Sequence, residues 1–186
     1  MDLSGPRANA GGGRAARNAR LAFLALLALY GFAYLRDPAG GHLIDGLDLA
    51  IHETGHLVFA PFGEFVQFAG GTLFQLIVPG VFLAYFLRFA PKRDAFAASV
   101  AVWWLAVNLW NVAVYAADAR TQALPLVGGG EHDWAYLLGR MGLLRHDAGV
   151  AASFRALGAT LYLAALVWGW RAATAPAAVD AEAGAR

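Results

Sequence analysis

The sequence predicts an all-α, polytopic membrane protein with about five transmembrane helices. Of its 186 residues, 59% are hydrophobic and only 15% are charged, and the mean hydropathy is +0.51. Soluble domains are typically about 45–50% apolar and about 25% charged. Apolar runs of near-spanning length also recur along the chain, separated by short polar segments. The excess apolar surface is therefore expected to face lipid.

The composition excludes several classes of protein. The chain has no cysteine, which rules out a disulfide scaffold, an iron–sulfur cluster, a thiolate zinc site and a cysteine nucleophile. A net charge of +1, with the aromatic residues in apolar runs, argues against nucleic acid as a partner. Lys92 is the one lysine among 14 basic residues, a bias that suggests a GC-rich bacterial genome. We therefore expect the lipid bilayer of a bacterial inner (cell) membrane as the environment.

Two tails flank the predicted membrane domain, which covers residues 21–171. Residues 1–20 form a basic, glycine-rich N-terminal tail that is expected to be disordered, and so is the low-complexity C-terminal tail 172–186. The arginines ahead of the first apolar run place the N-terminus in the cytoplasm by the positive-inside rule. Because this run has no convincing small-residue cleavage site, we interpret it as an uncleaved anchor.

Five segments are candidates for crossing the membrane, since a spanning helix needs about 20 mostly apolar residues. If all five cross, Lys92 and Arg93 face the side opposite to the N-terminus. If the stretch 63–71 is re-entrant instead, this assignment inverts. The five segments are residues 21–35, 43–61, 72–89, 95–117 and 154–170, with a tight turn at 91–94 and a polar stretch at 118–151.

The second segment contains an HExxH motif, His52-Glu53-Thr54-Gly55-His56. On a helix, His52 and His56 stand four residues apart, so both imidazoles point to one side and can hold one metal ion. Glu53 lies beside them, where it can act as a general base toward water. Neutral imidazoles suit Zn²⁺, which needs a third protein ligand and keeps one position open in a catalytic site. Because ionisable groups at membrane depth are usually functional, we favour a metal site over two histidines that are merely hydrogen-bonded.

Asp45 and Asp48 extend the polar stripe of this segment toward its start. Asp48 is four residues before His52, so its carboxylate could hold the far N–H of that ring and fix its tautomer. The alternative is that both aspartates are exposed to water at the start of the helix, where the helix dipole favours acids. Both interpretations of Asp48 stay open, and for Asp45 we favour exposure to water.

The fourth segment carries its own polar stripe of Asn108, Asn111, Tyr115 and Asp118, at spacings of three, four and three. One polar residue in such a segment often only hydrogen-bonds to a neighbouring helix. Four on one face favour a water-containing cavity, and we expect this face to look toward the histidines. There, Asn108 or Asn111 could hold the substrate strand or bind the oxyanion of a reaction.

The third metal ligand has to come from another part of the chain. Glycines 128–130 permit a sharp turn of the backbone and are followed by His132 and Asp133, which both have suitable donor atoms. We expect this loop to fold back and to bring Asp133 to the metal. Asp118, at the end of the polar stripe, and His132 are the alternative ligands.

These motifs resemble the site-2-protease family of intramembrane zinc metalloproteases. The family carries HExxH in a transmembrane helix, often with glycine at the fourth place, as Gly55 is here. A glycine pair that opens its next helix is similar to Gly70-Gly71, which Gln75 and Pro79 follow. The family then has an Asn-rich stretch that leads to an Asp-Gly ligand motif near a later helix.

The resemblance covers about residues 43–144, and the chain departs from the family at the last motif. In place of an Asn-Pro…Leu-Asp-Gly sequence it has Asn111…Asp118 and, later, His132-Asp133. The sequence has no PDZ or cystathionine-synthase-type regulatory domain. The resemblance therefore implies a minimal catalytic core.

We expect zinc-dependent hydrolysis of peptide bonds in or beside the membrane, with Glu53 as general base and His52, His56 and Asp133 as metal ligands. The substrate would be a membrane-embedded protein or peptide. The alternative is a non-enzymatic membrane adaptor or assembly protein that retains a structural metal site. The hypothesis of a haem or di-iron oxidoreductase has less support, because five histidines are too few for a histidine-box enzyme.

Overall fold

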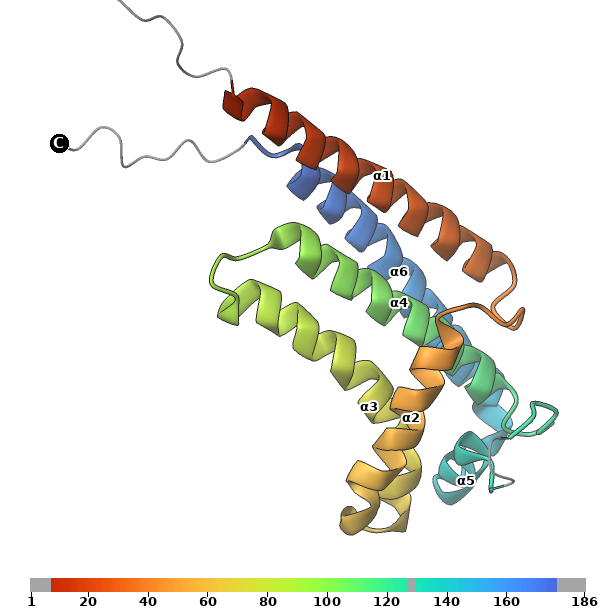
Figure 1. Ribbon diagram of the computed structural model, residues 1–186. Coiled ribbons are helices and arrows are strands. Elements are labelled where there is room, and N and C mark those ends of the chain that lie inside the picture. Colours follow the sequence, from red (N-terminus) through yellow and green to blue (C-terminus); the bar gives the residue numbers. More distant parts are fainter. Residues whose placement is uncertain (1–7, 127–129, 177–186) are drawn as a thin grey trace, which may run out of the picture.

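The computed structural model describes residues 8–126 and 130–176, and all regular structure in these two ranges is helical. The prediction of an all-α protein is therefore confirmed. The long helices run side by side as a bundle, and two shorter helices, α2 and α5, lie toward one end of it (Figure 1). The elements are α1 (Ala8–Arg36), α2 (Asp45–Phe59), η1 (Ala60–Phe62), α3 (Glu64–Ala84), η2 (Tyr85–Phe89), α4 (Ala95–Ala117), α5 (Asp133–Arg140), η4 (Leu144–His146) and α6 (Asp147–Thr174).

Four helices are long and apolar enough to cross a membrane, which supports a membrane protein. The helix α2, which carries the HExxH motif, has only 15 residues. At 1.5 Å per residue it is about 22 Å long, shorter than the roughly 30 Å hydrocarbon core of a bilayer. A separate crossing by residues 43–61 therefore stays a prediction. The four candidate spans are Gly13–Arg36, Glu64–Phe89, Ala95–Ala117 and Leu144–Thr174.

The arrangement of the helix ends favours the inverted assignment of Lys92 and Arg93 over the one expected from five crossings. The start of α1 and the end of α6 lie at the same end of the bundle (Figure 1). The ion pair between Arg20 Nη2 and Asp94 Oδ2, 3.7 Å long, brings the turn at 91–94 to that end too. Lys92 and Arg93 therefore share a side with the start of α1 instead of facing the opposite side. The physical reason is that α2 is short and the chain reverses between α2 and α3, which brings the end of α3 back to the end of the bundle where α1 begins (Figure 1).

Several helices extend beyond their predicted bounds. Residues 8–20, expected to be disordered, form the first turns of α1, and residues 172–174 complete the last turn of α6. The segment 64–71 lengthens the helix predicted for 72–89. Once an apolar run has nucleated a helix, each further residue gains a hydrogen bond at little extra entropic cost. The reversal before α3 occurs at Gly63, whose φ of 94° is readily adopted by glycine because it has no Cβ.

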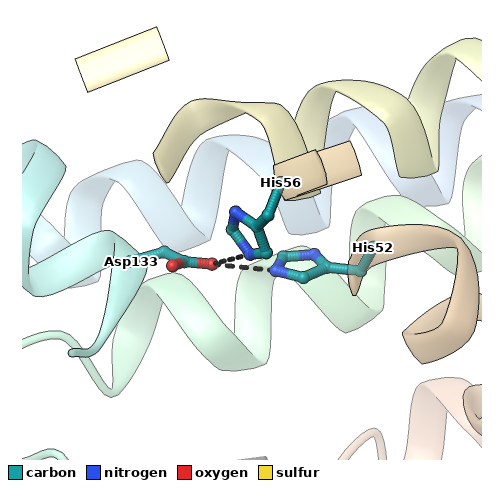
Figure 2. Close-up of side chains that lie close together, drawn as sticks. All are labelled: His52, His56 and Asp133. Atoms are coloured by element: carbon teal, nitrogen blue, oxygen red, sulfur yellow. Dashed lines mark hydrogen bonds and ion pairs between the residues drawn. The ribbon is translucent and has the colours of Figure 1, made fainter. Parts of the chain in front are cut away.

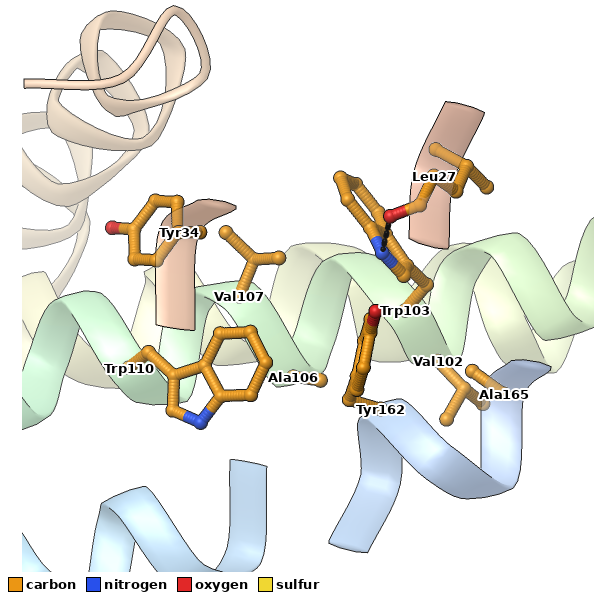
Figure 3. Close-up of a cluster of buried hydrophobic side chains, with 9 residues drawn as sticks. All are labelled: Leu27, Tyr34, Val102, Trp103, Ala106, Val107, Trp110, Tyr162 and Ala165. Atoms are coloured by element: carbon orange, nitrogen blue, oxygen red, sulfur yellow. Dashed lines mark hydrogen bonds between the residues drawn. The ribbon is translucent and has the colours of Figure 1, made fainter. Parts of the chain in front are cut away.

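The core of the bundle is α4, the most buried of the four candidate spans, on which Ala106, Val107 and Trp110 are fully buried. It packs along α6 and α3 and also contacts α1. Trp103 Nε1 donates to the carbonyl oxygen of Leu27 at 3.0 Å, as Figure 3 shows within a cluster of aromatic and aliphatic side chains. The hydroxyl of Tyr162 donates to the carbonyl oxygen of Ala28 at 2.6 Å. Packing and interhelical hydrogen bonds are the interactions that hold helices together in lipid.

The outer faces of the other long helices remain apolar. Such extended apolar surface is unfavourable in water and is matched by the hydrocarbon of a bilayer. The exposed large apolar side chains include Phe23, Leu26, Leu29 and Phe32 on α1, Leu73, Ile77 and Val81 on α3, and Leu157, Leu163 and Val167 on α6.

Candidate metal centre

His52 and His56 project from the same side of α2, and their rings lie edge to face with centroids 4.8 Å apart. Asp133, at the start of α5, reaches both: its Oδ2 lies 2.8 Å from His52 Nε2 and 3.2 Å from His56 Nε2 (Figure 2). One ligand atom of each residue lies within 4.8 Å of the others. The three side chains therefore form a cluster that can hold a metal ion, and the predicted convergence of the two histidines is confirmed.

The other ring nitrogens indicate how this cluster fits a cation. His56 Nδ1 lies 2.8 Å from the carbonyl oxygen of Gln67, and His52 Nδ1 lies 3.1 Å from Gln75 Oε1. Each Nδ1 can donate to its neighbouring oxygen, and each Nε2 points toward the Asp133 carboxylate, so a cation between them would meet both Nε2 atoms. Two adjacent imidazolium ions repel each other, whereas one divalent cation would be bound by a lone pair of each ring and by the carboxylate. Two imidazoles and a carboxylate are a ligand set found in catalytic zinc sites.

Glycines let α2 and α3 approach closely enough to fix the His52 ring. Gly55, at the fourth place of HExxH, lies against the backbone of Gly70, and a Cβ at either position would collide with the other helix. A Cβ on Gly71 would collide with the His52 ring itself. Small residues at a helix interface allow such close backbone approach. The glycine pair that the sequence singled out therefore forms the wall against which His52 rests.

Asp133 is positioned by the first turn of α5. The preceding residue, His132, caps this helix, because its Nδ1 accepts from the backbone N–H of Ala135 at 3.2 Å. The backbone N–H of Asp133 donates to the hydroxyl of Tyr115 on α4 at 3.2 Å. Burial would raise the pKa of the Asp133 carboxyl, but the two histidine rings outweigh this effect and hold the pKa below its ordinary value. The cluster thus has an ionised carboxylate to offer a cation.

The two alternative ligands are engaged elsewhere. Asp118, just after α4, accepts hydrogen bonds from the Thr121 hydroxyl and from the backbone N–H groups of Ala123 and Leu124. His132 Nε2 faces Asp118 Oδ2 at 3.4 Å instead of facing the cluster. Burial would raise the pKa of Asp118, but its hydrogen-bond donors together lower it below the ordinary value. Asp118 therefore organises the loop that follows α4.

Two cavities, of about 340 and 290 Å³, adjoin the cluster, and the exposed side chain of Glu53 lines both. His52 and Asn111 also line the first cavity, and Asp133 lines the second. Tyr115 lines both, which agrees with the expectation that the polar stripe of α4 borders a cavity at the histidines. The Glu53 side chain therefore lies in the wall of both cavities, next to the cluster.

Two predicted roles are corrected by the structure. Asp48 is only 1% exposed, and its Oδ1 accepts from Trp104 Nε1 at 2.8 Å, so it neither holds His52 nor faces water. Asn108 is fully buried, donates to the Trp104 carbonyl oxygen one turn earlier, and lines neither of these two cavities. The reason is that the Asp48 side chain meets Trp104 of α4, whereas Asp45, His52 and Glu53 of the same helix line the first cavity.

Sequence reasoning assigned no role to Gln75, which is 2% exposed and contacts His52. Its signal was a single amide in an otherwise apolar segment, a position where a polar group is costly and usually functional. Asn111 lines the cavity as expected, but its amide is already hydrogen-bonded on both sides. Of the predicted glycine turn, Gly128 and Gly129 lie outside the described residues.

The fold and the site together define a helical protein with four candidate membrane spans and a His₂Asp cluster beside an acid-lined cavity. No protein-family model, curated protein or solved structure matches this chain. The functional interpretation therefore depends on the geometry of the site.

Proposed function

We propose that this protein is a zinc-dependent membrane peptidase that hydrolyses peptide bonds in or beside the bilayer, as its resemblance to the site-2-protease family implies. The observation that carries the proposal is the position of Glu53, the acid of HExxH, in the wall of both cavities beside the His₂Asp cluster. Structural zinc sites are closed by four protein ligands, whereas catalytic sites have three and keep one position open. Three ligands next to a cavity therefore support hydrolysis over a purely structural site.

Each of the chain's own groups has a part in this chemistry. Zinc, when bound, would supply Lewis acidity toward water and the scissile carbonyl group. His52, His56 and Asp133 would hold the ion. Glu53 accepts the proton of the attacking water and returns it to the leaving amine. The hydroxyl of Tyr115, whose oxygen accepts the Asp133 N–H, keeps its own proton to donate to a developing oxyanion in the cavity.

The substrate in this proposal is a membrane-embedded protein or peptide. A helical peptide bond is covered and internally hydrogen-bonded, so the substrate has to unwind locally before water can attack. We place the protein in the bacterial inner membrane with its N-terminus in the cytoplasm. The turn that holds Lys92 and Arg93 would then face the cytoplasm too, in agreement with the positive-inside rule.

The decisive experiment substitutes the proposed base. Glu53→Gln keeps the shape of the side chain and removes its basicity, so zinc content should stay at one ion per chain while cleavage of a membrane-embedded reporter falls by about 10²–10⁴-fold. Glu64→Gln is the matched control, because Glu64 also lines the second cavity but accepts a hydrogen bond from Tyr136 at 2.9 Å. It should cleave at close to the wild-type rate.

The outcomes separate the candidate functions. Cleavage by Glu53→Gln at the wild-type rate would refute the hydrolase mechanism. Tight zinc binding by a wild-type protein that cleaves none of a panel of membrane peptides would favour the non-enzymatic adaptor. Iron in place of zinc in the purified protein would favour an oxidoreductase.

A further inference from the structure

A file of side-chain hydrogen bonds leads away from the metal cluster. His52 Nδ1 lies 3.1 Å from Gln75 Oε1, and Gln75 Nε2 donates to Asn111 Oδ1 at 3.0 Å. Asn111 Nδ2 in turn donates to Asp45 Oδ1 at 3.5 Å, the longest of the three links. The residues come from α2, α3 and α4, and all four line the 340 Å³ cavity. The file therefore ties three helices together around the space in which a substrate would lie.

The far end of this file is firmly held. Asp45 Oδ1 also accepts from the hydroxyl of Tyr34 at 2.8 Å, and its Oδ2 accepts from the backbone N–H of His42 at 2.6 Å. The ring of His42 stacks on Tyr34 with centroids 4.2 Å apart. Tyr34 is fully buried at the end of α1. The Asp45 carboxylate is thus anchored by α1 and by the loop that follows it.

The carboxylate dictates the direction of every bond in the file. An ionised carboxylate can only accept, so Asn111 has to turn its NH₂ group toward Asp45 and its oxygen toward Gln75. Gln75 then has to use its NH₂ group on Asn111 and its oxygen on His52. His52 can donate a hydrogen bond to the Gln75 oxygen only if its Nδ1 carries a proton. One tautomer of the neutral ring satisfies the whole chain of bonds.

We propose that Gln75, Asn111 and Asp45, the relay, are positioning residues that hold His52 as the Nδ1–H tautomer and so aim the Nε2 lone pair at the metal. A carboxylate often performs this task by direct contact with a metal-bound histidine. Here two amides carry the constraint from a carboxylate that does not touch the ring. The proposal rests on the metal site of the proposed function and is independent of its proteolytic step.

The second histidine provides an internal comparison. His56 Nδ1 donates to a backbone carbonyl group, that of Gln67, so its tautomer is fixed without any side chain. His52 depends on Gln75, which is almost completely buried. Loss of that amide would leave a buried N–H unsatisfied or let the ring adopt the tautomer that cannot bind metal. The relay is therefore expected to act on one ligand of the two.

The test measures zinc affinity of the full-length protein in detergent, by competition with a chromophoric chelator. Gln75→Leu should weaken zinc binding by about 10–100-fold, the usual effect of losing a group that orients a metal ligand. Asn111→Leu should change the affinity in the same direction. Gln75→Glu restores an acceptor for His52 and should bind zinc more tightly than Gln75→Leu. Asn108→Leu is the matched control, because Asn108 lies one turn away on α4, donates to the Trp104 carbonyl oxygen and lines neither cavity, so this variant should bind as the wild type.

A spectroscopic readout separates positioning from simple packing. With Co²⁺ in place of zinc, the d–d absorption bands should shift in Gln75→Leu and stay unchanged in Asn108→Leu, provided that both variants show the wild-type elution volume and unfolding temperature. Wild-type zinc affinity in Gln75→Leu and Asn111→Leu would overturn the relay, as would an equal loss in Asn108→Leu. If the wild type binds zinc and the variants lose it, the relay stands even if no peptide is cleaved. If the wild type cleaves peptides and Gln75→Leu keeps its affinity, the relay fails and the proposed function stands.

Discussion

The contact between the glycine pair and the metal ligand makes Gly71→Ala a sensitive test of the site. An alanine methyl group at this position would lie 2.6 Å from His52 Cδ2 and Cε1, whereas ordinary van der Waals contacts are 3.4–4 Å. Gly71 belongs to the buried side of α3, so the methyl group cannot turn away. The His52 ring therefore has to move, and it takes its Nε2 atom with it.

The size of the effect follows from the size of the displacement. Relieving the collision requires a shift of about 1 Å, and misplacements of that order cost enzymes about 10²-fold in rate. Displacing an orienting contact of a metal ligand typically costs about 10–100-fold in metal affinity. This corresponds to roughly 1.4–2.8 kcal/mol of binding free energy, at about 1.4 kcal/mol per factor of ten.

The assay compares Gly71→Ala with Gly80→Ala on the same helix. No heavy atom lies within 4 Å of a Cβ built on Gly80, so that substitution should leave zinc affinity unchanged and stabilise α3 slightly, since alanine is the better helix former. Zinc affinity of both variants is measured by chelator competition, with thermal unfolding in detergent as a check on folding. Wild-type zinc affinity in a folded Gly71→Ala protein would refute the placement of His52 against α3.

Two further predictions concern stability. Gly55→Ala should lower the free energy of unfolding by about 1–3 kcal/mol, because the new Cβ meets the backbone of α3. Gly46→Ala on the same helix should not lower it, because the space around that Cβ is open. Unfolding in mixed detergent micelles measures both variants, and equal effects would contradict the close approach of α2 and α3. Asp118→Asn should be less stable than the wild type at neutral pH. The folded-state pKa of Asp118 lies below its ordinary value. The difference in the free energy of unfolding between the two proteins should therefore be largest at a pH above the ordinary pKa, and it should vanish as the pH falls through the lowered pKa. A difference that does not depend on pH would contradict the assigned hydrogen bonds.

Local features of the sequence were sufficient for the fold class and for half of the site. The all-α character follows from apolar runs bounded by Gly, Pro and charged residues, because each run determines a helix from the residues within it. The i, i+4 spacing of His52 and His56 fixes their common side on any helix, so their convergence needed no tertiary information. The glycine pair at 70–71 was also visible as a motif, although its contact with His52 was not.

Only the tertiary structure decided which distant groups complete the site. Asp133 is 81 positions from His52, and the glycine turn ahead of it favoured Asp133 without excluding Asp118; only packing gave each carboxylate its partners. Asp48 has suitable spacing to hold His52, yet its carboxylate accepts from Trp104 on α4 instead. Gln75 of α3 contacts His52 in place of Asp48. Periodicity determines the face of a helix on which a residue lies, whereas the crossing of helices determines what that face meets.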